Sequence, residues 1–377
     1  MSALATMKGM SVFILLSMSP LIASSPFGGF ELGGVLYSVL SANHYRGEQK
    51  NIRFSGMNTL ELRGHNTNRE YGMVRLEADF HMLYGDYANV FVKQMEEQTG
   101  SSLALGEAPV VADLRELYMA FYPRFADIAV GRQIVTFGRG AVLSPLDIFS
   151  TIDIRDIYFK RKGSDVVSVR VPRNILSGID FISELPVGDN EHASALKYFT
   201  TFRGFDLDLI GIYRHRSQTG VAGLAFKGDV HFGIYGEMVT HFEEALKSSH
   251  FEFMFGTDYS FLRNNLIFSL EYLYNGLTIH PDSLSTDSVT AELPTPFFRT
   301  HYLFFNASYS VNELLRLSGN ILYNFDGRGL VGTLLVRYNL LQNVNLTSYI
   351  QAVHRDFYGD AFSGPDLTYS ARVEVAF

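Results

Sequence analysis

Long stretches in which apolar and polar residues alternate constrain the fold of this chain more than any other feature. Between Val74 and Tyr84 the even positions are apolar, and the odd positions include Arg75, Glu77 and Asp79. Because successive side chains of a β-strand point to opposite faces, this stretch predicts a strand with one apolar and one polar face. The same pattern recurs at 230–242, 250–261, 313–325 and 330–340.

The lengths and connections of these stretches favour a membrane barrel over a soluble sheet protein. They run for about 10 to 14 residues, whereas strands of globular proteins usually have about 5 to 6. Short and longer links alternate between them, and aromatic residues gather at strand ends. These are the marks of an outer-membrane barrel. The sequence therefore predicts an all-β fold, a single transmembrane antiparallel β-barrel; a soluble secreted β-sandwich is the alternative.

Composition excludes several other classes of protein. The chain has no cysteine, which excludes a disulfide scaffold, a zinc finger, an iron–sulfur cluster and a thiol nucleophile. It has 31 Lys and Arg against 39 Asp and Glu, a net charge of −8. Such a balance argues against nucleic acid as a partner.

Both ends of the chain carry features of export. Residues 1–25 combine Lys8, a short apolar stretch and small residues, and they predict a signal peptide followed by one barrel domain over 26–377. The last alternating strand ends on Phe377. This resembles the membrane-insertion signal that outer-membrane barrels present to their insertion machinery. We expect the outer membrane of a diderm, Gram-negative-type bacterium, with outer-membrane lipid around the barrel.

Nineteen candidate strands can be marked, beginning with 31–44, 52–64, 69–84 and 86–96. A single-chain bacterial barrel with both ends in the periplasm has an even number. We therefore predict 18 strands, with 16 as the alternative, and expect the error to lie in the pair 31–44 and 52–64. The longer links all fall on the outer side in this scheme: 97–113, 138–163, 243–249, 277–296 and 357–366.

One stretch near the middle resembles a known family. A strand ends in Gly131-Arg132-Gln133, a Gly138-Arg139 pair follows, and Pro145-Leu146-Asp147 lies beyond it. This is similar to a hairpin and loop of porin-like barrels of the alginate-export type and their relatives. It departs at Phe137, where that family commonly has tryptophan. The resemblance implies a passive outer-membrane channel.

Charged residues of the predicted loop and of the late strands are the candidate site. In and beside the loop we select Arg132, Arg139, Asp147, Asp153, Arg155 and Asp156. Folded into the barrel mouth, they would constrict the pore; alternatively, their pairs only pin the loop to the wall. Late strands contribute Arg316, Arg337 and Arg372, whereas the middle strands are acidic. Small anionic or polar solutes would then pass along the basic wall, unless this is an ordinary solvated barrel interior.

No catalytic or cofactor motif is evident. His250 and Glu252 would share one face of a strand, but two ligands are too few for a metal site. We expect no enzyme activity, cofactor or metal. The predicted function is a porin-like channel for passive diffusion of small hydrophilic solutes. The alternative is a non-conducting surface protein whose long loops bind polysaccharide or a host partner. The sequence leaves the solute and the oligomeric state open.

Overall fold

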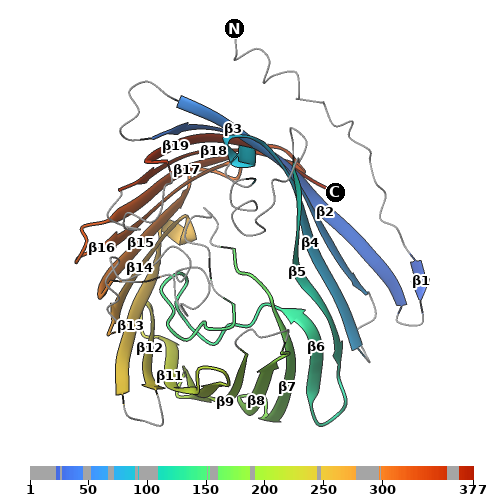
Figure 1. The fold of residues 1–377 in the computed structure, drawn as a ribbon, viewed down its shortest axis with the longest axis vertical. Coiled ribbons are helices and arrows are strands. Elements are labelled where there is room, and N and C mark those ends of the chain that lie inside the picture. The colour runs from blue at the N-terminus through green and yellow to red at the C-terminus, as the bar shows by residue number, and fades with distance from the viewer. Residues whose placement is uncertain are drawn as a thin grey trace.

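The computed structural model is a closed antiparallel β-barrel (Figure 1). The described residues form nineteen strands, and eighteen of these, β2 to β19, make up the ring. The ring closes where β19 pairs with β2 over Ala376↔Val35 to Leu367↔His44. The prediction of 18 strands is confirmed, and the β-sandwich alternative is wrong. The structure describes residues 23–25, 28–45, 52–66, 72–89, 92, 109–150, 152, 160–186, 192–243, 248–276, 297, 299–354 and 365–377.

Each strand pairs with the next one along the chain, so the barrel is a simple meander. A 3-10 turn, η2 (Leu262–Asn264), joins β13 to β14. The strands of the ring are β2 (Gly28–His44), β3 (Ile52–Asn66), β4 (Gly72–Gly85), β5 (Val110–Phe121), β6 (Asp127–Gln133), β7 (Ser164–Asn174), β8 (Ser177–Glu184), β9 (Ala193–Phe202), β10 (Phe205–Arg214), β11 (Thr219–Asp229), β12 (Gly233–Glu243), β13 (Ser248–Phe261), β14 (Leu266–Asn275), β15 (His301–Ser310), β16 (Leu315–Asn324), β17 (Leu330–Leu341), β18 (Val344–Val353) and β19 (Leu367–Ala376).

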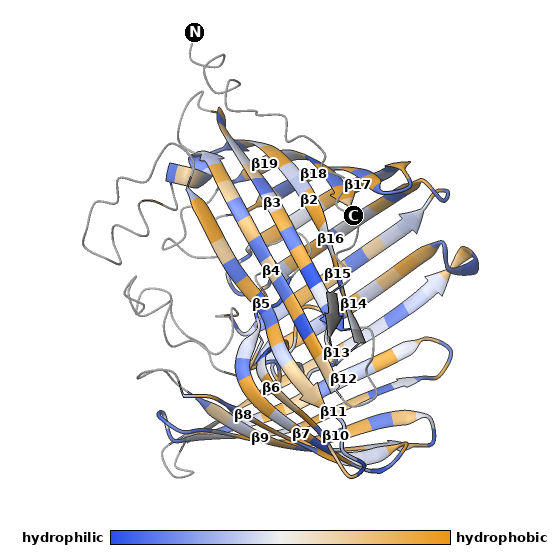
Figure 2. Ribbon diagram, turned by 90° about the vertical axis from the view of Figure 1, so that its right-hand side faces the viewer, coloured by the Kyte–Doolittle hydropathy of each residue, from blue (hydrophilic) through white to orange (hydrophobic). Residues whose placement is uncertain are grey.

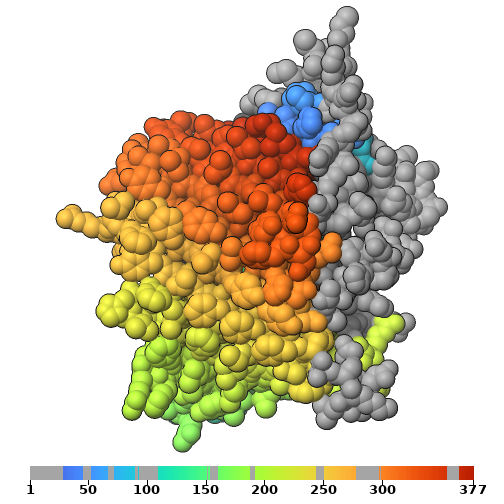
Figure 3. Space-filling view, turned by 90° about the vertical axis from the view of Figure 1, so that its left-hand side faces the viewer, coloured from blue at the N-terminus to red at the C-terminus, as the bar shows by residue number. Residues whose placement is uncertain are grey.

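The alternation of the sequence separates the two faces of the wall. On β4, Glu77 and Asp79 are buried on the inside, whereas Phe80 is exposed on the outside. Figure 2 shows this as bands of orange and blue along β3 and β4, and Figure 3 shows the continuous outer surface of the later strands. An apolar exterior around a polar interior suits a lipid environment. Among the described residues, no helix is long and apolar enough to cross a membrane.

The surplus candidate strand was 86–96, not one of the early pair. Both 31–44 and 52–64 lie within strands, β2 and β3. Strand β4 ends at Gly85, which has a left-handed φ of +63°, and residues 86–89 are helical. A Cβ at Gly85 would lie 2.3 Å from the Phe54 carbonyl oxygen, so only glycine fits this turn. The strand therefore stops where the alternation suggested a hairpin.

The expected separation of long and short links is confirmed. Strand order places the β4–β5, β6–β7, β14–β15 and β18–β19 links at one end of the barrel. The opposite end has short turns, such as 203–204 and 342–343, together with the start of β2 and the end of β19. The β12–β13 link is shorter than predicted, with only 244–247 between the two strands.

The C-terminal residue takes part in closing the barrel. The Phe377 amide donates to the Gly34 carbonyl, and the Gly34 amide donates to the Phe377 carbonyl, both at 3.0 Å. The Phe377 ring lies against Gly34, where an added Cβ would come within 2.8 Å of it and within 2.4 Å of the Glu61 carbonyl oxygen. The predicted insertion signal is thus also part of the β2–β19 seam.

The predicted signal segment ends in a short strand. Strand β1 (Ala23–Ser25) pairs with Gly28–Phe30 at the start of β2. Residues 1–22 lie outside the described residues. Cleavage of 1–25 stays a prediction.

We predict that Gly34→Ala weakens the seam. The added methyl group meets a backbone carbonyl and the Phe377 ring, and such overpacking costs about 1–3 kcal/mol. Urea titration of the detergent-folded barrel, followed by heat-modifiable gel migration, measures the change in unfolding free energy. Gly211→Ala is the matched control, because a Cβ there meets nothing within 4 Å; it should stay within about 0.5 kcal/mol of wild type. Equal stability of the two variants would contradict this account of the seam.

Candidate functional site

The link between β6 and β7 folds into the barrel (Figure 1). Of this lumen loop (residues 134–163), the structure describes 134–150, 152 and 160–163. Leu143 and Leu146 have no exposed surface. Leu146 belongs to an apolar cluster with inward side chains of β7 to β12, and Leu143 to a second cluster with side chains of β12 to β17. The loop therefore packs against the inner wall.

Two buried glutamates of the wall hold the backbone of this loop. Glu237 on β12 accepts hydrogen bonds from the amides of Arg139 (2.6 Å), Gly140 (2.9 Å) and Leu146 (3.2 Å). It also accepts one from the Ser144 hydroxyl at 3.1 Å. These bonds satisfy backbone groups that are otherwise buried without partners, and bonds to a carboxylate are stronger than those to a neutral acceptor.

Glu271 on β14 repeats the arrangement for the next turn of the loop. It accepts from the amides of Ala141 (2.6 Å), Val142 (3.1 Å) and Leu143 (2.8 Å), and from the Tyr235 hydroxyl at 3.0 Å. Both carboxylates are fully buried. Alternation alone places these two glutamates inside the barrel. No sequence signal identifies the loop amides as their partners, and neither was among the selected site residues.

Asp147 closes the loop on itself. Its Oδ1 accepts from the amides of Phe137 and Gly138, each at 2.9 Å, and its Oδ2 lies 2.6 Å from the Arg161 guanidinium. Burial raises the pKa of the Asp147 carboxyl above its usual range, although Arg161 and the two amides act in the opposite direction. The pairing therefore only partly offsets the cost of burying this charge. Asp147 shapes the loop rather than facing the lumen as a free charge.

Two other loop cations pair with different parts of the wall. Arg139 contacts Asp208 of β10 at 2.5 Å. Lys160 contacts Glu61 of β3 at 2.9 Å and Asp79 of β4 at 3.4 Å. Burial would lower the pKa of the Lys160 ammonium, but neighbouring acidic groups outweigh it and hold the pKa above its usual value. Lys160 thus keeps its charge and attaches the returning end of the loop.

Arg132 secures the base of the loop. Its guanidinium forms a two-point ion pair with Asp165 of β7, at 3.0 and 2.6 Å. These two residues lie on directly paired strands, one just before and one just after the loop. Gly131 has φ +125°, and a Cβ there would come within 2.3 Å of the Leu117 carbonyl oxygen. Here the structure favours the second reading, in which a charge pair pins the loop.

The late-strand arginines lie in one row. Register pairs Arg316 with Arg337, Arg337 with Thr347, and Thr347 with Arg372. This arginine row (Arg316, Arg337 and Arg372) crosses β16 to β19. Glu374 contacts Arg337 at 3.0 Å and Arg372 at 3.1 Å. Glu374 therefore contacts two of the three guanidinium groups, and the three residues of the row carry more positive charge than this carboxylate offsets.

The remaining site predictions divide into two groups. Asp153, Arg155 and Asp156 lie outside the described residues. The acidic character of the middle strands is present, but Glu237 and Glu271 are bound to the loop. Within the arginine row, Arg316 is exposed and Arg337 is partly exposed, whereas Arg372 is buried.

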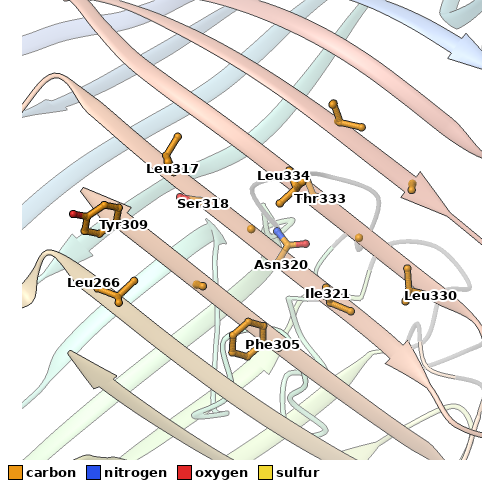
Figure 4. Close-up of a pocket in the computed structure, with 15 residues that line it drawn as sticks. Leu266, Phe305, Tyr309, Leu317, Ser318, Asn320, Ile321, Leu330, Thr333 and Leu334 are labelled. Atoms are coloured by element: carbon orange, nitrogen blue, oxygen red, sulfur yellow. The ribbon is translucent and has the colours of Figure 1, made fainter. Parts of the chain in front are cut away.

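The outer wall has a separate hollow. A groove of about 580 Å³ runs across β15 to β18, where Ala307, Gly319, Gly332 and Ala352 leave space among larger apolar side chains. Leu317, Leu334 and Phe305 are among the side chains that line it (Figure 4). These positions alternate with the inward ones, so the groove faces the surroundings of the barrel. It plays no part in the lumen site.

A serine and a histidine also meet, outside the lumen loop. Ser194 Oγ lies 2.9 Å from His215 Nε2, and His192 stacks on the His215 ring at 4.6 Å. A serine nucleophile needs a histidine that a third group, commonly a carboxylate, orients. Within the described residues no carboxylate contacts His215. The pair therefore does not form a catalytic triad there.

Comparison with solved structures identifies the fold. OccAB3 of Acinetobacter baumannii has a TM-score of 0.56 at 9% identity, covering 92% of this chain and 99% of that chain. A triple mutant of the Rhodopseudomonas blastica porin has a TM-score of 0.46 at 14% identity, covering 92% and 100%. No protein-family model and no curated protein sequence matches the chain. The fold is that of a porin-like barrel, and the resemblance to the alginate-export type stays a prediction.

We predict that Glu271→Gln loosens the lumen loop. The amide nitrogen of glutamine cannot accept the loop N–H groups, and an unsatisfied buried donor costs about 1–3 kcal/mol. This corresponds to a rise of about 5- to 150-fold in the open population. Limited trypsin digestion of the folded barrel, read at Arg139 and Arg161, measures it. Glu252→Gln is the control, because Glu252 is equally buried but contacts histidines of the wall. Equal cleavage rates in both variants would refute the anchoring role of Glu271.

Proposed function

We propose that this protein is a porin-like channel in the outer membrane of a Gram-negative-type bacterium. It conducts small hydrophilic solutes by passive diffusion and has no enzymatic role. The observation that carries the proposal is a closed eighteen-strand ring whose inner face carries many charged side chains and is narrowed by one loop packed against it. Barrels of this size enclose an aqueous channel when side chains do not fill them.

The arginine row supports a preference for anions. Arg316, Arg337 and Arg372 form one basic line across four strands, and Glu374 contacts Arg337 and Arg372. A charged wall next to a low-dielectric barrel raises the local concentration of ions of the opposite sign. Small anions would therefore follow this side of the lumen.

A non-conducting surface protein is the competing proposal. The lumen loop packs apolar side chains against the inner wall. If the loop fills the rest of the barrel's cross-section, it blocks the channel. The long links would then bind a polysaccharide or a host partner. Planar-bilayer recording separates the two functions: stable open-channel steps support the porin, whereas silence from a heat-modifiable, folded barrel overturns it.

We predict that Arg337→Ala lowers the anion preference of the channel. Removal of this guanidinium takes away part of the positive charge that offsets the Glu374 carboxylate. The reversal potential under a salt gradient should therefore shift toward the equilibrium potential of the cation. The shift should shrink in 1 M salt, where the Debye length falls to about 3 Å.

Arg173→Ala is the matched control for this measurement. Arg173 is exposed near the end of β7, away from the row, and its removal changes the net charge by the same amount. It should leave the reversal potential unchanged. If both variants behave alike, or if the wild type shows no anion preference, the selectivity proposal fails even if the protein conducts.

A further inference from the structure

Two histidines and a glutamate converge on the inner wall, away from the lumen loop anchors. His241 lies near the end of β12 and His250 near the start of β13, and register pairs them directly across the two strands. Glu252 lies two positions beyond His250 and so shares its face of the sheet. The sequence placed His250 and Glu252 on one face of a strand; the pairing of β12 with β13 brings His241 to them.

The ligand atoms of this cluster have the spacing of a metal site. His241 Nε2 lies 3.1 Å from Glu252 Oε1, and His250 Nε2 lies 3.7 Å from the same oxygen. One ligand atom from each of the three residues lies within 4.8 Å of the others. Tetrahedral ligands at about 2.0–2.1 Å from Zn²⁺ are roughly 3.3–3.4 Å apart. The two Nε2–Oε1 distances lie on either side of that spacing.

Burial and ligand chemistry also favour a bound metal ion at this cluster. His241 and Glu252 are 3% and 2% exposed, so a bound ion would be well shielded from bulk water. The two imidazole rings stack with centroids 4.1 Å apart and planes within 12°, and both Nε2 atoms are directed to one carboxylate oxygen. Imidazole nitrogen with carboxylate oxygen suits zinc and its neighbours among the divalent transition metals. An acidic wall that also carries Glu237 and Glu271 favours a cation electrostatically.

We propose that His241, His250 and Glu252 bind one divalent transition metal ion of the zinc class. The three residues supply three ligands from two adjacent strands, and a fourth position remains for water or a solute. The ion would cross-link β12 to β13 close to the outer end of the barrel. This proposal does not depend on whether the lumen conducts.

Titration of Zn²⁺ alone into the full-length, detergent-folded protein tests the proposal by calorimetry, after treatment with a chelator. We expect one ion per chain. His241→Gln and Glu252→Gln should each weaken binding at least about tenfold, since even loss of a residue that supports a ligand commonly costs 10- to 100-fold. Co²⁺ serves as a second probe, because its visible absorption reports nitrogen and oxygen ligands directly.

Two matched controls use features of the same molecule. His192→Gln removes one ring from the other stacked histidine pair, which has no carboxylate partner among its recorded contacts. Asp180→Asn removes a buried carboxylate of β8, which pairs with Arg170 and Lys197 and lies away from β12 and β13 in the strand order. Both should bind Zn²⁺ as wild type does. Heat-modifiable migration on gels verifies that every variant is folded.

The outcomes divide cleanly. Weaker binding in the two ligand variants, with both controls unchanged, supports the site. Absence of binding to wild type, or equal affinity in the ligand variants and the controls, overturns it. If a ligand variant fails to fold, the Co²⁺ spectrum of the wild type decides: a spectrum of hexaaqua Co²⁺, with no ligand-field band from imidazole, rejects the proposal.

Discussion

Complete backbone hydrogen bonding is the constraint on which this structure depends. A strand edge in a lipid environment has no water to satisfy it, so the sheet must close on itself. Closure is reached where β19 meets β2, and the reciprocal bonds between Gly34 and Phe377 extend that pairing to the last residue. Because the closing pair β2–β19 is antiparallel like all the others, the ring has an even number of strands, and its first and last strands leave their free ends at the same end of the barrel.

The same requirement acts inside the barrel. When the lumen loop folds against the wall, its backbone amides leave water and have no partner strand to accept their hydrogen bonds. The carboxylates of Glu237 and Glu271 on the wall accept these bonds instead. A buried carboxylate is costly in isolation, but several N–H donors on each one compensate it. Each glutamate therefore depends on the loop as much as the loop depends on the glutamate.

Sequence patterns predicted the wall far better than the site. Alternation depends on immediate neighbours along the chain, so it identified the strands, the inner face and the basic late strands. Alternation wrongly predicted a strand at 86–96, because β4 ends at Gly85 with a left-handed φ. A single backbone angle does not change the alternation of apolar and polar residues. The partners of Glu271 and Arg132 are set by contacts between distant segments. Likewise, His241 joins Glu252 only through the register of β12 and β13, which no local pattern specifies.

The attachments of the lumen loop have a mechanical consequence. Its base is at β6 and β7, its middle is held by β10, β12 and β14, and Lys160 returns it to β3 and β4. The loop thus braces distant arcs of the ring against each other, and the wall cannot flatten there without breaking buried ionic contacts. Strands β15 to β17 meet the loop through the apolar cluster around Leu143, without an ionic contact among those described for the loop. Elastic deformation of the barrel should therefore concentrate in the arc of these strands, which also carries Arg316 and Arg337 of the arginine row.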